Sequence, residues 1–140
     1  MSPPQEIDVE IRWPDVDGFG HVSHMALVAI AEHGRSRWLD GILSVAPGTW
    51  PYIVAHLEFD FYSPVAFTDR FVSCRIRPVH VGTSSVRLDE RIASPDGMPV
   101  AQATSVIVAW DAEGSEKRAL SAEERFTLCR YLERRSSKAP

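Results

Sequence analysis

Four strand-like runs joined by short links dominate the chain after residue 51. They span residues 52–62, 70–80, 84–94 and 99–110. The last link contains Pro95-Asp96-Gly97, which is typical of a hairpin turn. Parallel neighbours need a crossover of a dozen or more residues, whereas antiparallel strands can be joined by a tight turn. The runs therefore predict consecutive antiparallel strands in one sheet.

The first of these runs shows the alternation of a strand with one buried face. Its apolar side chains are expected on one face: Ile53, Ala55, Leu57, Phe59 and Phe61. The other face carries His56, Glu58 and Asp60, a pattern typical of a solvated or subunit-facing surface. We expect the apolar face to pack into the core.

A single long amphipathic helix is predicted before these runs, from about His24 to Asp40. Its apolar stripe consists of Leu27, Ile30, Ala31, Gly34 and Trp38. Ser23 is a suitable N-cap because its hydroxyl can accept from a free N–H of the first turn. A further strand is expected over residues 6–13. A last helix is expected over 121–134, where Ser121 and Glu124 fit a capping box.

One helix stripe and the apolar faces of the strands can be buried together if the sheet wraps around the helix. The predicted fold is therefore α+β, a hotdog fold with a single antiparallel sheet around a long central helix. The 140 residues are enough for one domain, and residues 1–5 and 135–140 are expected to be loose ends.

Composition limits the classes of function. The net charge is −4 and no long basic stretch is present, so no nucleic-acid partner is expected. No apolar run approaches the ~20 residues that span a membrane. The N-terminus also lacks the basic and apolar regions of a signal peptide. These features indicate a soluble, cytoplasmic protein.

The loop before the long helix carries residues suited to chemistry. Residues 15–24 have the sequence DVDGFGHVSH. The first turn of a helix has unpaired N–H groups and a partial positive charge, which stabilise the oxyanion formed when a thioester carbonyl is attacked. A carboxylate beside that end, such as Asp17, can act as a nucleophile or as a general base for water.

This run, followed by Glu32-His33-Gly34-Arg35 in the helix, resembles the motif of the 4-hydroxybenzoyl-CoA thioesterase family. Residues 57–64, Asp69 and residues 81–86 resemble later family segments in the same order. The resemblance covers about residues 6 to 112. It implies a thioesterase that hydrolyses an acyl-CoA or acyl-carrier-protein thioester. Coenzyme A is then part of the substrate, and no separate cofactor is expected.

The resemblance also implies roles for individual residues. Asp17 matches the catalytic aspartate, and the backbone N–H of His24 matches the group that polarises the thioester carbonyl. Positions near the acyl group are Gly20, His21 and Leu27, and positions near coenzyme A are Thr83, Ser84 and Ser85. Phe19 lies beside the motif and is a candidate to line the acyl site. Leu27 stands where the family usually has tyrosine, so it bears on the choice of acyl group.

Several of these residues have other interpretations. Asp17 can simply shape a turn, because aspartate binds nearby N–H groups in loops, and Asp15 is interpreted as such a residue. Some hotdog thioesterases carry their carboxylate on the helix, so Glu32 is the alternative catalytic residue. Otherwise Glu32 is expected to pair with Arg35 one turn later. His21 and His24 lie three residues apart without a visible third ligand, so no metal site is expected.

Two other functions fit the same fold. A hydratase or dehydratase acting on enoyl thioesters needs a different arrangement of Asp and His. A non-catalytic module would bind an acyl-CoA or an acyl-carrier protein without releasing thiol.

The family resemblance implies a homodimer with sheets paired edge to edge and active sites at the interface. A homotetramer built from two such dimers is the other assembly expected.

Overall fold

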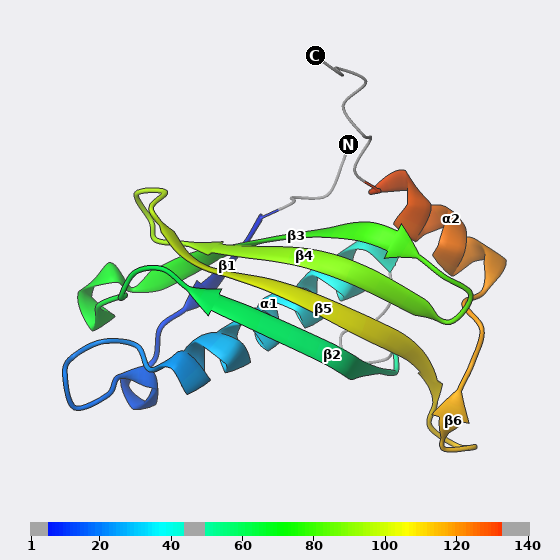
Figure 1. Cartoon of the computed structure of the whole chain (residues 1–140), viewed down its shortest axis with the longest axis horizontal. Helices are drawn as coiled ribbons and strands as arrows, with labels where there is room; N and C mark the ends of the chain where they lie inside the picture. Colours follow the sequence, from blue (N-terminus) through cyan, green and yellow to red (C-terminus); the bar gives the residue numbers. More distant parts are fainter. Residues whose placement is uncertain (1–5, 44–49, 133–140) are drawn as a thin grey trace, which may run out of the picture.

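The structure is a computed structural model that describes residues 6–43 and 50–132. The expected loose ends at 1–5 and 135–140 lie outside the described residues. None of the helices in the described ranges combines the length and apolar character needed to cross a membrane. The elements in chain order are β1 (Glu6–Glu10), η1 (Trp13–Asp15), α1 (His24–Leu43), β2 (Tyr52–Phe61), η2 (Phe67–Asp69), β3 (Phe71–Val81), β4 (Ser85–Ala93), β5 (Pro99–Asp111), β6 (Glu116–Lys117) and α2 (Ala122–Arg130) (Figure 1).

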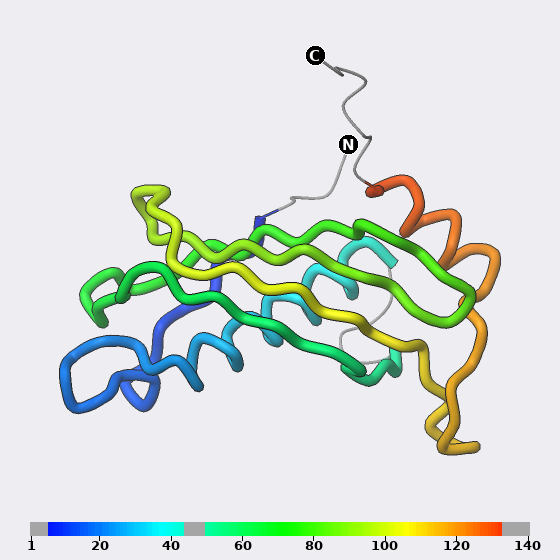
Figure 2. Tube along the Cα trace, in the orientation of Figure 1, coloured from blue at the N-terminus to red at the C-terminus, as the bar shows by residue number. Residues whose placement is uncertain are grey.

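The strands form one antiparallel sheet in the order β1-β3-β4-β5-β2. Tight turns join the neighbours β3, β4 and β5, as the short links predict, whereas β1 and β2 are the edge strands. The sheet curves along α1, and α2 lies at one end of it (Figures 1 and 2). This arrangement confirms the predicted hotdog fold. The short β6, which pairs with the end of β5, is not predicted by the sequence pattern.

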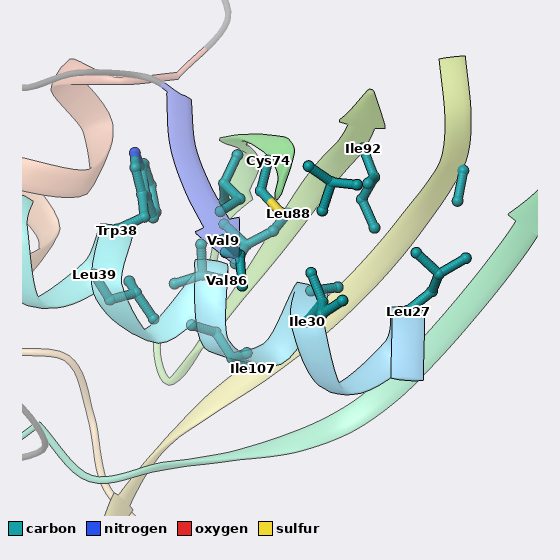
Figure 3. Packing of buried hydrophobic residues seen from close by; sticks show 14 of the residues in the cluster. Val9, Leu27, Ile30, Trp38, Leu39, Cys74, Val86, Leu88, Ile92 and Ile107 are labelled. Atoms are coloured by element: carbon teal, nitrogen blue, oxygen red, sulfur yellow. The ribbon is translucent and has the colours of Figure 1, made fainter. Parts of the chain in front are cut away.

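The core lies between α1 and the sheet. The helix begins at the predicted residue His24 and buries its predicted stripe: Leu27, Ile30, Ala31, Gly34 and Trp38. From the sheet, Val86, Leu88 and Ile107 point towards the helix and are at most 1% exposed (Figure 3). Burying a side chain of this size stabilises the fold by about 1.5–3 kcal/mol. These contacts hold the helix against the sheet.

Gly34 allows α1 to approach β3 closely. A Cβ atom at this position would lie 3.0 Å from the Cβ and 3.1 Å from the Sγ of Cys74. Burial in the core, together with the charge of Glu90, raises the pKa of the Cys74 thiol to about 12. Cys74 therefore packs as a small neutral side chain, and the gap in front of it has no room for a methyl group.

Gly34→Ala is expected to destabilise the protein by about 1–3 kcal/mol, because the added methyl group forces packed elements apart. Gly41 in the same helix provides the control, since a Cβ there meets nothing within 4 Å. Gly41→Ala is expected to stabilise the helix by up to about 1 kcal/mol. Urea unfolding of both variants measures the difference, and two variants of equal stability would contradict the close approach at Gly34.

A buried ion pair joins α1 to the middle of the sheet. The Nε and Nη2 atoms of Arg35 donate to the carboxylate of Glu90 at 2.8 and 3.0 Å, and the Ser105 hydroxyl donates to the same carboxylate. All three residues are at most 2% exposed. The predicted pair of Glu32 and Arg35 is therefore wrong. Glu32 is exposed, and a buried guanidinium needs its carboxylate inside the core.

Strand β2 does not bury the apolar face predicted for it. Its residues Ile53, Val54, Leu57 and Phe61 are 38–47% exposed, and α1 comes closest to β1 and β3 at the opposite edge of the sheet. A register shift between Val54 and His56 adds one residue to this strand. Ile53 therefore faces the opposite side of the sheet from Leu57, contrary to the simple alternation. Strands β1 and β2 are the two edges of the sheet, and the β2 edge is exposed.

Helix α2 closes the end of the sheet where β3 turns into β4. The predicted capping box is confirmed, because Ser121 and Glu124 exchange hydrogen bonds between side chain and backbone. The Glu124 carboxylate also pairs with Arg118 and accepts from the indole of Trp50. Burial opposes ionisation of Glu124, but these bonds outweigh it and hold its pKa at about 2. Glu124 therefore remains a charged anchor for α2 at neutral pH.

Candidate active site

A tight loop presents Asp17 just before α1. Val16 and Val22 form an antiparallel bridge across its base, and the Asp17 N–H donates to the carbonyl of His21 at 2.8 Å. Gly20 closes the turn by donating its N–H to the Asp17 carbonyl at 3.1 Å. Its φ of 82° lies in the left-handed region that favours glycine. The loop is therefore fixed by its own backbone.

The Asp17 carboxylate is held by one oxygen and free at the other. Its Oδ1 accepts from the N–H of Phe19 at 2.8 Å and from the N–H of His21 at 3.2 Å. Within the described part of the chain, no group donates to Oδ2, and the side chain is exposed. The turn-shaping interpretation is thus confirmed for Oδ1. Oδ2 remains available for a water molecule or a substrate carbonyl carbon.

The first turn of α1 lies directly after this loop and has two unused donors. The predicted N-cap is confirmed, since the Ser23 hydroxyl accepts from the N–H of Ala26 at 3.1 Å. The Ser23 carbonyl accepts from the N–H of Leu27 at 3.0 Å. The N–H groups of His24 and Met25 have no acceptor among the described residues, as expected for a helix N-terminus. No acidic side chain lies in this turn to offset its positive end.

Asp15 fixes the base of the loop through hydrogen bonds with residues on either side of it. It is 4% exposed, and its carboxylate accepts from the backbone N–H of Arg12 at 2.7 Å and from the guanidinium of Arg12 at 3.1 Å. Its carbonyl accepts from the N–H of Ser23 at 2.9 Å, which ties the helix cap to the preceding segment. The loop-shaping role predicted for Asp15 is confirmed.

The other residues of the motif surround this helix end. Phe19 is 88% exposed at the tip of the loop. His21 forms a bridge with Ala66, which links the loop to the segment before η2. The His24 ring meets the ring of Phe61 edge-on, with centroids 6.1 Å apart. The loop, the helix N-terminus and the end of β2 therefore lie together.

Two predicted residues lie away from the exposed loop. Leu27 is 4% exposed and packs in the core, so its side chain contributes to the buried floor beneath the helix end. Glu32 is exposed on α1, eight residues and about 12 Å along the helix from His24. No group of three or more His, Cys, Asp or Glu side chains in the described ranges is arranged to hold a metal ion.

The turn from β3 into β4, which includes Thr83–Ser85, lies at the opposite end of the sheet from the loop before α1 (Figure 1). Ser85 pairs with Val108 and Val108 with Ile53, near the start of β2. Phe61, at the other end of β2, is the residue that contacts His24. Strand β2 spans about 30 Å. A single chain therefore does not bring the predicted coenzyme A contacts to the predicted catalytic residue.

Two features of the site are not predicted by the motif. The N–H of Met25 is a second free donor, a position that follows from Ser23 being the cap. Phe61 stands beside His24 although its strand was expected to bury it in the core. Only the pairing of β2 at the edge of the sheet reveals that it lines the site.

Several solved structures with the same fold are named as thioesterases or as members of the thioesterase superfamily. One from Jannaschia sp. is 21% identical, with 96% of this chain and 99% of that chain covered at a TM-score of 0.83. A thioesterase from Thermus thermophilus, complexed with coenzyme A and Zn, is 24% identical over 90% and 92% of the chains, at a TM-score of 0.76. A 1,4-dihydroxy-2-naphthoyl-CoA thioesterase from Synechocystis is 16% identical over 89% and 94%, at 0.75. At these identities the likeness concerns the fold.

The sequence comparison extends this likeness to a family. No curated protein matches the chain. The family model described as the thioesterase-like superfamily matches residues 11–139, which include the loop, α1 and the whole sheet after β1. The chain therefore belongs to the thioesterase-like superfamily.

Proposed function

We propose that the protein hydrolyses an acyl-CoA or acyl-carrier-protein thioester to the free acid and the thiol. Membership of the superfamily supports acyl-thioester hydrolysis in general. The proposal is carried by the free Oδ2 of Asp17 and by the two unused N–H groups at the start of α1, which follows this loop in the chain. Acyl transfer from a thioester requires a carboxylate and an oxyanion site of these kinds.

In the proposed mechanism the thioester carbonyl oxygen accepts from the N–H groups of His24 and Met25. These donors strengthen as negative charge develops on that oxygen in the tetrahedral state. In one route Oδ2 of Asp17 attacks the carbonyl carbon, the C–S bond breaks, and the thiolate takes a proton from water. The hydroxide formed from that water then cleaves the mixed anhydride, which releases the free acid and restores the Asp17 carboxylate.

In the other route Asp17 removes a proton from water while the resulting hydroxide attacks the carbonyl carbon. The C–S bond breaks and the proton passes to the leaving thiolate. Both routes need the same free oxygen and the same helix end, and they differ in whether the acyl group becomes attached to Asp17 during turnover. Acid quenching of a single turnover, followed by mass measurement of the protein, distinguishes them by the presence or absence of the acyl adduct.

We also propose that two copies pair along β2. This strand is an exposed edge that carries apolar side chains, and an uncovered edge of this kind is a template for another strand. If two β2 strands pair in antiparallel fashion, the Tyr52 end of one lies beside the Phe61 end of the other. The Thr83–Ser85 turn of a second copy then approaches Asp17, so the dimer completes a site that one chain leaves divided.

Val54→Asp is expected to convert the dimer to a monomer at micromolar concentration, because it places a charge on the paired edge. Analytical ultracentrifugation measures the mass, which for one copy is 15.6 kDa. Val79 on β3 is the matched control, since both valines are 38% exposed. Val79→Asp is expected to keep the mass of the wild type. A wild-type protein that sediments as a monomer would contradict the pairing.

Thiol release from a panel of acyl-CoA and acyl-carrier-protein substrates tests the proposed hydrolysis. We expect release from at least one member, and the panel then identifies the thiol carrier. Tight binding without release would indicate a binding module. Loss of the double bond of an enoyl-CoA without thiol release would indicate a hydratase. Either outcome would replace the proposed function.

A further inference from the structure

Four side chains form an apolar row on the helix-facing side of β2: Val54, Leu57, Phe59 and Phe61. Their partners across β5 are Ile107, Ser105, Ala103 and Ala101, and these are at most 2% exposed. Paired residues share one face of a sheet. The row therefore lies on the core side, yet Val54, Leu57 and Phe61 are 38–47% exposed.

Helix α1 comes closest to β1 and β3, at the other edge of the sheet. It contacts β2 near the two ends of the strand, where Ser36 bonds to Tyr52 and His24 meets Phe61. The charged residues Glu58 and Asp60 of the same strand pair with Thr104 and Gln102 and face the other side. Ser105, the cross-strand partner of Leu57, uses its hydroxyl to donate a hydrogen bond to the Glu90 carboxylate. The row is thus an apolar strip with no free polar group of its own.

One end of this row lies at the candidate site. The ring of Phe61 meets His24 edge-on at 6.1 Å, and Phe59 stacks on Phe61 at 5.5 Å with an interplanar angle of 19°. From Phe61 the row runs about 13 Å along the strand to Leu57. An apolar track therefore leads directly away from the N–H groups proposed to hold the thioester carbonyl.

We infer that this row is the floor of the acyl-binding site, and that the substrate carries a straight, unsubstituted acyl chain of medium length. The inference rests on the proposed thioesterase function. The first carbons of the chain lie against Phe61, and its far end lies against Leu57. Because each methylene that leaves water strengthens binding by roughly fourfold, kcat/KM is expected to rise from butyryl-CoA to decanoyl-CoA.

Leu57→Trp tests the inference by blocking the row four residues along the strand from Phe61. The ratio of kcat/KM for decanoyl-CoA to that for butyryl-CoA is expected to fall by tenfold or more. Ile53→Trp is the matched control, since Ile53 is 39% exposed on the same strand but pairs with Val108 on the other face. It is expected to leave the ratio within twofold of the wild type. Leu57→Ala is expected to move the preference towards longer chains.

The outcomes separate this inference from the proposed function. An active wild type whose chain-length ratio is the same in Leu57→Trp, Leu57→Ala and Ile53→Trp would overturn the inference and leave the thioesterase standing. A uniform loss on every chain length, together with loss of the dimer, would make the row a contact between copies only. No thiol release by the wild type from any acyl-CoA or acyl-carrier protein would overturn the proposed function itself.

Discussion

Asp17→Asn is expected to lower kcat by about 10²–10⁴-fold, the range typical of the loss of a positioned acid or base. An amide neither attacks a thioester nor removes a proton from water. Its oxygen can still accept from the N–H groups of Phe19 and His21, which bind Oδ1 in the structure. The loop is therefore expected to keep its shape, so the variant separates chemistry from folding. Thiol release and thermal unfolding, measured on the same sample, report the two effects.

Asp69→Asn is the control for this experiment. Its Oδ2 accepts from the N–H of Ala66 at 3.0 Å, a turn bond of the same type as those of Asp17, but it lies outside the loop before α1. It is expected to keep kcat within a few-fold of the wild type. If Asp17→Asn stays within tenfold of the wild type while Glu32→Gln loses activity, the catalytic carboxylate is Glu32.

Removing one partner of the Arg35–Glu90 pair is expected to give the largest loss of stability in the molecule. Glu90→Leu leaves a guanidinium without a carboxylate at a site that is 1% exposed. Such an uncompensated buried charge destabilises a fold by about 3–5 kcal/mol. Burial alone lowers the pKa of Arg35, but the hydrogen bonds and charge of Glu90 outweigh it and hold the pKa above its usual value. Arg35 therefore stays charged at neutral pH.

The double variant Arg35→Met with Glu90→Leu is expected to recover most of that loss, since apolar side chains of similar volume replace a buried pair well. Urea unfolding of the single and double variants measures the recovery. Arg75 is the exposed control, because it pairs with Glu6 at 2.6 Å while more than half of each side chain is exposed. Arg75→Met is expected to cost less than about 1 kcal/mol. A single variant of the buried pair that costs equally little would contradict this account.

Local patterns predicted the elements well because their signals lie within a few residues. Ser23 marks the start of α1, and Ser121 with Glu124 marks the start of α2. The predicted end of α1, at about Asp40, is too early, because the helix continues through Gly41 to Leu43. Ile42 is 7% exposed, so its burial in the core carries the helix past a residue that usually ends one.

Long-range pairing is what the sequence alone does not reveal. Arg35 and Glu90 are 55 positions apart, and nothing local favours that partner over Glu32 one turn away. The exposure of β2 likewise depends on where the helix sits on the sheet. At the candidate site, the motif identified Asp17 and the helix end. The free Oδ2 and the second donor at Met25 follow only from the hydrogen bonds of the folded loop.

The strand order has a consequence for the synthesis of the chain. Because β1 pairs with β3 and β2 pairs with β5, the first two strands leave the ribosome before either has a partner. The hairpins β3–β4 and β4–β5 join neighbours in sequence, and such local contacts form fastest. The later half of the chain is thus the template onto which the earlier half folds. Until Asp111 has emerged, α1 and β2 have no complete sheet to join, and the apolar surfaces of these partly synthesised chains favour aggregation.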